Sequence, residues 1–170
     1  MKILLTFIFL PVLIVAVSLQ GCSTSSASAA KADEIVMGPF ARARLGEGAF
    51  HWFAEGYSDY SPNVDAVRGI GAMWGDTRVL IVLGTWCGDS KREVPRFFKI
   101  ADQAGLPAAL IELYGVDRKK EGTDATPSRN GIEKVPTFIF LRDGREIGRI
   151  VESPAKSLEQ DMLEILSRRG

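Results

Sequence analysis

The amino-acid sequence predicts an α/β domain, with a mixed sheet of about four strands flanked by helices and a helical extension before it. Three observations predict this fold class. Short apolar runs rich in β-branched residues are typical of strands buried inside a sheet. Segments with apolar residues at helical spacing lie before, between and after these runs. The chain has 170 residues, of which 46% are hydrophobic and 25% are charged, and this composition is ordinary for one globular domain.

The chain starts with a segment that has the layout of a secretory signal. Lys2 is followed by a mostly apolar run from Ile3 to Leu19, and a basic residue before such a run is typical of the signal. A transmembrane helix is the alternative. The run is at the short limit for crossing a bilayer and contains Pro11, so a signal peptide is the favoured interpretation.

The apolar run ends in Leu19-Gln20-Gly21-Cys22, which resembles the lipobox of bacterial lipoproteins. The resemblance implies that residues 1–21 are a signal peptide that is removed and that Cys22 is lipidated. The protein would then be anchored in the bacterial cell envelope, facing the periplasm or the exterior. Ser23 in place of aspartate favours the outer over the inner membrane of a diderm bacterium. Residues 22–33 have little to bury and are expected to form a flexible tether.

Residues 34–76 are predicted to form the helical extension. Phe50, Phe53 and Tyr57 share one face of a helix, because their spacing matches the helical period. Asn63 is placed to cap a second helix. The aromatic side chains of this extension are expected to pack against the core rather than to bind a ligand.

The core of the domain begins with Val79–Leu83, a continuous apolar run that predicts a central strand. A helix over Lys91–Ala104 follows, and Pro95 inside it predicts a kink. Ala108–Leu113 predicts the second strand, which should be parallel to the first because a helix connects them. The polar stretch Asp117–Asn130 indicates a loop with about one helical turn.

The last part of the core predicts a hairpin and a helix. Thr137–Leu141 predicts the third strand. Asp143-Gly144 is a hairpin signal, so Glu146–Glu152 is expected to be a fourth strand antiparallel to the third. Ser153-Pro154 is expected to open a final helix. These elements place a domain over residues 77–170, with helices on both faces of its sheet.

The stretch Thr85–Ser90 carries the strongest chemical signal of the chain. It lies where the first strand turns into a helix, and Cys87 stands near the start of that helix. The unpaired N–H groups and partial positive charge of a helix N-terminus favour thiolate over thiol, and the thiolate is the nucleophile. A lone cysteine can instead be a small buried hydrophobe. The junction of strand and helix favours the reactive interpretation, because it exposes the sulfur.

Two separated motifs resemble the thioredoxin superfamily. Trp86-Cys87-Gly88 follows an apolar strand and Val135-Pro136-Thr137 precedes another. A glycine-containing hairpin and a terminal helix complete the pattern over residues 79–168. The resemblance implies a thioredoxin-like fold in which Pro136 is cis and lies against Cys87.

The same resemblance implies how a substrate is bound. An extended partner would meet backbone groups on both sides of the cis-proline, and it would cover the surface around the cysteine. The residues implied in substrate binding are Trp86, Gly88, Asp89, Val135 and Thr137.

The sequence departs from the superfamily at three positions. The family motif is Trp-Cys-Gly-Pro-Cys, and here Asp89 replaces the proline and Ser90 replaces the second cysteine. Ile81 stands where the family has a buried acid that assists proton transfer involving the second thiol. Ser90 Oγ is expected instead to donate a hydrogen bond to the Cys87 thiolate. Lys91 and Arg92 are expected to stabilise this thiolate electrostatically and Asp89 to oppose it.

The resemblance and the departures together imply thiol–disulfide exchange with one thiol. Cys87, with Ser90 and Pro136 completing the catalytic set, would form a mixed disulfide that an external thiol or a thiol of the substrate must resolve. A lipidated Cys22 cannot pair with Cys87. The partners implied are protein or small-molecule thiols and disulfides, together with a membrane through the lipid on Cys22. Whether the protein is an enzyme stays open.

Two other functions are compatible with the same residues. One is a non-catalytic binding or chaperone module that uses the thioredoxin-like fold at the cell envelope. The other, weaker one is peroxide or sulfenic-acid chemistry at Cys87.

The composition argues against several other kinds of function. The formal net charge is zero, so no nucleic-acid partner is indicated. One histidine and two cysteines are too few soft ligands for a protein-only zinc site, and no cofactor is expected. The single histidine, His51, is expected to be structural. The basic trio Arg118–Lys120 is expected to be solvated.

Overall fold

The computed structural model describes residues 34–168, so the predicted signal peptide, the tether and Cys22 lie outside the described residues. None of the helices within 34–168 is long and apolar enough to cross a membrane. The elements in chain order are β1 (Gly38–Phe40), a 3₁₀ turn (Arg42–Gly46), α1 (His51–Asp59), α2 (Val64–Met73), β2 (Arg78–Leu83), α3 (Gly88–Gln103), a second 3₁₀ turn (Ala108–Leu110), β3 (Ile111–Gly115), α4 (Thr126–Arg129), β4 (Thr137–Arg142), β5 (Arg145–Val151) and α5 (Leu158–Leu166).

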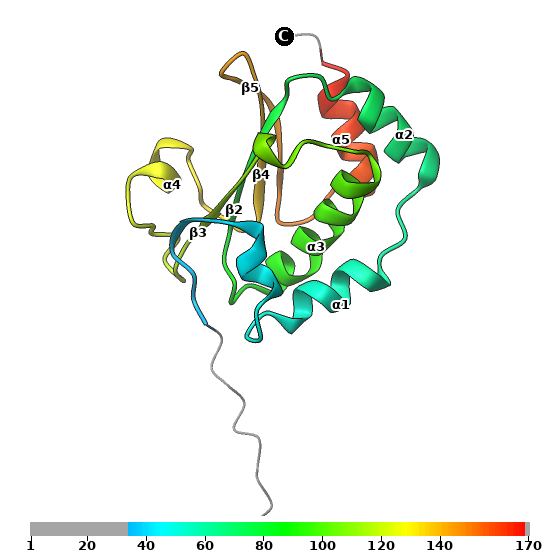
Figure 1. Cartoon of the computed structure of the whole chain (residues 1–170). Coiled ribbons are helices and arrows are strands. Elements are labelled where there is room, and N and C mark those ends of the chain that lie inside the picture. Colours follow the sequence, from blue (N-terminus) through cyan, green and yellow to red (C-terminus); the bar gives the residue numbers. More distant parts are fainter. Residues whose placement is uncertain (1–33, 169–170) are drawn as a thin grey trace, which may run out of the picture. The chain divides into compact units, whose positions relative to one another are not determined.

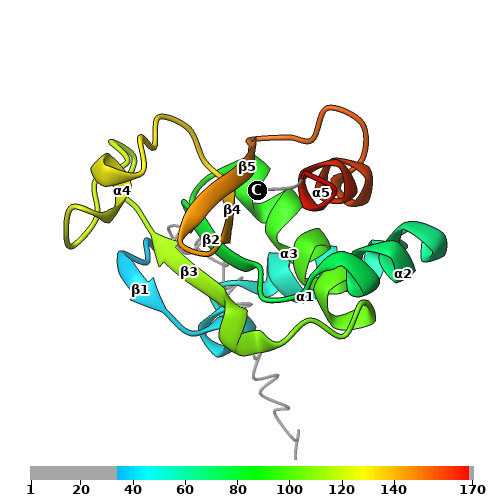
Figure 2. The ribbon, with the colours of Figure 1, turned by 90° about the horizontal axis from the view of Figure 1, so that it is seen from above.

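Five strands form one mixed sheet in the order β1-β3-β2-β4-β5 (Figures 1 and 2). β2 and β3 are parallel, and every other neighbouring pair is antiparallel. The predicted parallel pair and the predicted β4–β5 hairpin are therefore confirmed. β2 lies in the middle of the sheet, and its Ile81, Val82 and Leu83 are fully buried, as expected for a continuous apolar run.

β1 has no counterpart among the predicted strands. It is 3 residues long and contains Pro39, so neither alternation nor β-branched content marks it. It pairs with the outer edge of β3, with Gly38 opposite Gly115. A side chain at Gly115 would collide with the carbonyl group of Val36, so this close approach requires glycine. The segment before the core is therefore not wholly helical, although α1 and α2 form as predicted and Asn63 caps α2.

The predicted starts of the second strand and of the final helix are wrong. The second strand begins at Ile111, because the three residues before it form a 3₁₀ turn. Apolar content does not separate these two states, and alanine is a poor strand former. The final helix begins at Leu158 rather than after Ser153-Pro154, and Ser157 caps it by accepting a hydrogen bond from a backbone N–H. A local capping side chain decides this boundary more strongly than the proline does.

The four longer helices, α1, α2, α3 and α5, pack over one face of the sheet (Figure 2). Phe97 of α3 stacks on Phe138 of β4, with 5.3 Å between the ring centroids, and both side chains are fully buried. Phe53 of α1 meets Phe98 of α3 edge to face at 5.7 Å. These buried rings confirm that the extension's aromatic side chains contribute to the core.

The opposite face of the sheet carries a smaller apolar cluster that includes Val82, Ile132 and Ile139. The segment between β3 and β4 lies over it, and this segment contains only the short helix α4. Helices on both faces were expected, but on this side the structure has a single turn of helix. The loop prediction for Asp117–Asn130 is thereby confirmed.

Arg42 ties the turn after β1 to α3. Its guanidinium makes two 2.7 Å hydrogen bonds to the Asp102 carboxylate, and it lies over the ring of Phe98 at 4.3 Å. The Tyr57 hydroxyl donates to the same carboxylate at 2.8 Å. The hydrogen bonds from Arg42, and then from Tyr57, hold the pKa of Asp102 below its usual value.

We expect Phe97→Ala to lower the free energy of unfolding by about 3–5 kcal/mol, because it removes the stacked ring and leaves a cavity. Urea unfolding followed by circular dichroism measures this loss. Val64→Ala is the matched control: its side chain is 67% exposed, so its effect should stay within about 0.5 kcal/mol. Equal effects of the two substitutions would contradict the assigned core.

The lowered pKa of Asp102 predicts a pH-dependent effect of Asp102→Asn. A carboxyl whose pKa is lower in the folded state stabilises the fold above its unfolded pKa, and this stability is lost as the pH falls through the folded pKa. The substitution should therefore lower the melting temperature at about pH 7 and have no effect near pH 2. The loss should be small because both charged groups are partly exposed.

Thermal unfolding of the two proteins between these pH values tests the prediction. Asp76→Asn, in the exposed turn before β2, serves as the control and should show no such dependence. A loss of stability that persisted at the lowest pH would refute the electrostatic explanation.

Candidate functional site

The residues around Cys87 gather at one end of the sheet. β2 and β3 are parallel and finish at this end, and β4 begins there because it is antiparallel to β2. α3 begins at the same end, directly after the loop that leaves β2 (Figure 1). Thr85–Ser90 is thus brought close to the Val135-Pro136 peptide, which lies far from it in the sequence.

Cys87 is the N-cap residue of α3, which begins three residues earlier than predicted. Its backbone N–H donates to the Gly84 carbonyl at 2.8 Å, and its own carbonyl accepts from the Lys91 N–H at 3.0 Å. The side chain is half-buried and carries a free thiol. The sulfur therefore lies beside the unpaired N–H groups at the start of a long helix, which favour a negative charge.

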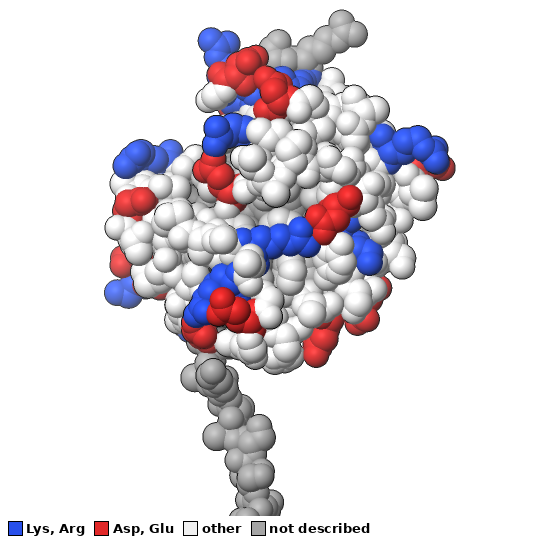
Figure 3. Space-filling model, in the orientation of Figure 1, with Lys and Arg blue, Asp and Glu red and all other residues white. Residues whose placement is uncertain are grey.

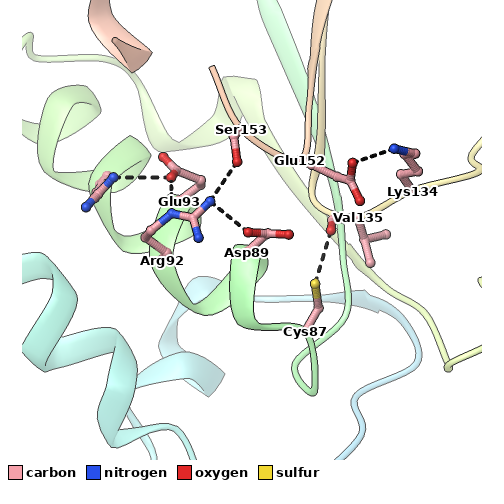
Figure 4. A network of polar contacts seen from close by, with 9 residues as sticks. Cys87, Asp89, Arg92, Glu93, Lys134, Val135, Glu152 and Ser153 are labelled. Atoms are coloured by element: carbon pink, nitrogen blue, oxygen red, sulfur yellow. Dashed lines mark hydrogen bonds and ion pairs between the residues drawn. The ribbon is translucent and has the colours of Figure 1, made fainter. Parts of the chain in front are cut away.

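The thiol faces the loop that precedes β4. The Cys87 Sγ–H donates to the Val135 carbonyl at 3.1 Å (Figure 4). The Val135-Pro136 peptide bond is cis, as the family resemblance implied. Thr137 lies at the end of the same loop but is 2% exposed, and its hydroxyl donates to the Lys134 carbonyl at 2.7 Å. Any contact of Thr137 with a partner would therefore come from its backbone.

Ser90 lies one turn along α3 from the thiol and is fully buried. Its Oγ accepts a hydrogen bond from the Gly84 N–H at 3.3 Å. This bond fastens the loop after β2 to the first turn of α3. The donation from Ser90 to a Cys87 thiolate stays a prediction.

Trp86 and Gly88 flank the thiol on the surface. The Trp86 indole N–H donates to the Val116 carbonyl at 3.0 Å, so the ring is fixed against the end of β3. A side chain at Gly84 would overlap this ring, which explains why glycine stands there. Gly88 has open space where a side chain would be. A partner can therefore approach the sulfur from this side.

Arg92 connects α3 to the segment after β5 (Figure 4). Its guanidinium pairs with Asp89 at 2.7 Å and with Glu93 at 2.6 Å, and it donates to Ser153 Oγ at 2.7 Å. The neighbouring Glu152 N–H donates to the Pro136 carbonyl at 2.7 Å. The helix that carries Cys87 and the cis-proline loop are thus joined through one network.

This network changes the expected electrostatics of the site. Arg92 was expected to stabilise a thiolate, and Asp89 to oppose it, but the two side chains neutralise each other. Glu93 is only 1% exposed and also binds Arg96, at 3.2 Å. Its other oxygen, Oε2, is buried without a hydrogen-bond partner among the described residues. The sequence held one signal for this burial: Glu93 shares a helical face with Ser90 and Phe97.

Thr85 is another residue of the site that the sequence does not reveal. Its side chain is buried, donates to the Glu34 carbonyl at 2.6 Å and accepts from the Val36 N–H at 3.2 Å. The segment before β1 is therefore held at the Cys87 end of the sheet. No group of His, Cys, Asp and Glu side chains within residues 34–168 is arranged to hold a metal ion.

Comparison with known proteins places the chain among thioredoxins. A thioredoxin-like protein of Acanthamoeba polyphaga mimivirus is 26% identical over 96 residues, which cover 55% of this chain and 67% of that protein. A TPR repeat-containing thioredoxin of Arabidopsis thaliana is 34% identical over 86 residues, covering 51% of this chain and 21% of that protein. The thioredoxin of Malassezia sympodialis is 34% identical over 87 residues, covering 50% of this chain and 78% of that protein.

A solved structure shares the fold. It belongs to a protein of unknown function from Pseudomonas aeruginosa. The two structures match with a TM-score of 0.54 and 18% sequence identity, and the matched region covers 78% of this chain and 91% of the Pseudomonas chain. A sequence model described as thioredoxin matches residues 56–164. This match spans more than half of the chain and includes both Cys87 and Pro136, and with it the chain belongs to the thioredoxin family.

Proposed function

We propose that this protein carries out thiol–disulfide exchange through Cys87 as a single-thiol member of its family. The observation that supports this most directly is the position of the sulfur. It caps α3, is accessible from the Gly88 side and lies 3.1 Å from the Val135 carbonyl beside the cis-proline. A nucleophilic thiolate needs this combination of helix terminus and access.

The proposed reaction has two exchange steps. The Cys87 thiolate attacks one sulfur of a substrate disulfide, the substrate S–S bond breaks, and the other sulfur leaves as a thiolate that takes up a proton from water. The product is a mixed disulfide on Cys87. An external thiolate then attacks this bond, restores the Cys87 thiolate and carries away the substrate sulfur as a new disulfide. A second thiol of the substrate can take the same role, and the outcome is then isomerisation.

The need for an external thiol follows from Ser90. It occupies the position of the family's second cysteine, one turn from Cys87 and fully buried. A hydroxyl cannot attack the mixed disulfide in place of a thiol, and residues 34–168 contain no other cysteine. The mixed disulfide should therefore be long-lived until a second molecule resolves it.

We further propose that the protein is anchored in a bacterial cell envelope by a lipid on Cys22. The lipobox supports the anchor, and the contact between Thr85 and the Glu34 carbonyl supports a particular orientation. It holds the start of the described chain at the end of the sheet that carries Cys87. Because an extended chain rises at most 3.3–3.6 Å per residue, a tether over 22–33 would keep this site within roughly 40 Å of the lipid surface.

The exchange proposal predicts that Cys87 accumulates a mixed disulfide. A mature chain with Cys22→Ser leaves Cys87 as the only thiol, and incubation with a peptide disulfide should give close to one peptide per protein by mass spectrometry. Cys87→Ser on the same background should give none. A protein that forms no adduct under these conditions would refute the exchange reaction. The non-catalytic binding module would be favoured if Cys87→Ser also complemented a deletion fully.

A second prediction concerns the missing resolving thiol. Ser90→Cys should release the bound peptide as a thiol and leave a disulfide between Cys87 and the introduced cysteine, because the new thiol lies one turn from Cys87 and can displace the substrate. We expect the adduct to fall at least about tenfold, and a disulfide between Cys87 and the introduced thiol to appear in the peptide map. Ser90→Ala is the control and should keep the adduct. Undiminished adduct in Ser90→Cys would contradict the proposed geometry.

A further inference from the structure

The loop after β3 starts at the same end of the sheet as the thiol because of the sheet topology. β3 is parallel to β2, so the chain leaves Gly115 at the end of the sheet where Leu83 leads to Cys87. Val116 connects the segment that leaves β3 to the segment that leaves β2. Its N–H donates to the Leu83 carbonyl at 3.0 Å, and its carbonyl accepts from the Trp86 indole N–H at 3.0 Å. The residues that follow Val116 therefore start next to Trp86.

This loop, Asp117–Glu121, is held by hydrogen bonds among its own residues. Asp117 Oδ1 accepts from the N–H groups of Lys119 at 2.8 Å and Glu121 at 2.9 Å. The Asp117 N–H donates to the Glu121 carbonyl at 3.0 Å. Lys120 adopts a left-handed conformation with φ 66°, which costs energy for a residue with a side chain. The backbone of this short loop is thus held in one conformation, and its basic side chains project from that backbone.

Arg118 is the residue of this loop that reaches the site. Its guanidinium carbon lies 5.1 Å from the centroid of the Trp86 ring, and Trp86 directly precedes Cys87. A guanidinium stacked on an aromatic ring keeps its N–H groups free to bind a carboxylate in bidentate fashion. The exposed Arg118 side chain is therefore prepositioned next to the thiol to receive an anion.

The charges of this loop differ from those elsewhere around the site. Arg92 is paired with Asp89 and Glu93, and Lys134 is paired with Glu152 at 2.7 Å. By contrast, none of the three basic residues of the loop forms an ion pair with a residue in the described part of the chain. These three residues, the basic trio, are Arg118, Lys119 and Lys120. The basic trio therefore provides positive charge in this loop that no ion pair within residues 34–168 compensates.

We propose that the basic trio selects polypeptide partners whose reactive cysteine is flanked by acidic residues. This inference rests on the proposed exchange reaction and adds a class of substrate to it. A carboxylate near the partner's sulfur would bind Arg118 while that sulfur meets Cys87, and the two lysines would attract acidic segments during approach. Complementary charge of this kind raises association rates and suppresses wrong partners.

An anionic membrane surface is the other partner that a basic loop can bind, and the observations favour it less. Lipid-binding sites of this type usually cluster about four to eight basic residues, whereas this loop has a trio between Asp117 and Glu121. Figure 3 shows Lys and Arg side chains interspersed with Asp and Glu over the face in view. The whole chain has a formal net charge of zero.

The test compares exchange rates for peptide disulfides of one length whose cysteine is flanked by aspartates, by lysines or by asparagines. With the Cys22→Ser chain at low ionic strength, we expect the acidic peptide to react about tenfold faster than the basic one. The ratio should fall to about twofold or less at about 0.5 M salt, because salt screens exposed charges. Replacing all three members of the basic trio by glutamine should remove the preference, and Lys119→Glu should reduce it.

The control variant removes the same charge away from the thiol, as Arg68→Gln in α2, Arg78→Gln at the opposite end of β2 and Arg145→Gln in the β4–β5 hairpin together, and should keep the preference. Equal rates for all peptides, or a preference that survives loss of the basic trio, would overturn the inference while leaving the exchange reaction intact. No reaction with any peptide would instead overturn the proposed function. Trio-dependent sedimentation with phosphatidylglycerol vesicles, without a peptide preference, would assign the loop to a membrane surface and also overturn the inference.

Discussion

The parallel pairing of β2 with β3 is the constraint on which the rest of this structure depends. Two parallel strands joined through α3 must finish at the same end of the sheet, and β4, antiparallel to β2, must begin there. The thiol of Cys87, the Val135 carbonyl and Arg118 come from three separate connections that meet at this end. With β3 in the opposite direction, Arg118 would lie at the far end of the sheet from Cys87.

Charge pairing around Cys87 serves the structure more than the chemistry. Arg92 holds Asp89, Glu93 and Ser153 together, and so fastens α3 to the segment that binds the cis-proline loop. A carboxylate as buried as that of Glu93 is costly unless it is paired, and two guanidinium groups supply the pairing. This pairing ties the start of α3 to the segment after β5.

The parts of the fold that could be predicted have local signals. The buried strands appear as continuous apolar runs, and the cis-proline appears in a short motif. β1 could not be predicted, because its 3 residues depend on an open edge of β3 and on the absence of a side chain at Gly115. The contact of Thr85 with Glu34 joins segments that are far apart in the sequence, so no local pattern reports it. The burial of Glu93 has only the helical face that it shares with Ser90 and Phe97 as a local signal.

The sequence by itself determined the position of the thiol between a strand and a helix, the replacement of its usual partner by Ser90, and the identity of the core strands. These features depend on the order and spacing of neighbouring residues. Only the tertiary structure decided that Arg92 is neutralised, that Trp86 is fixed to Val116, and that a loop expected to be merely solvated places Arg118 over the ring of Trp86, the residue before Cys87. The physical reason is that strand order and direction choose which loops become neighbours, and these are set by packing of the whole sheet rather than by any single stretch of chain.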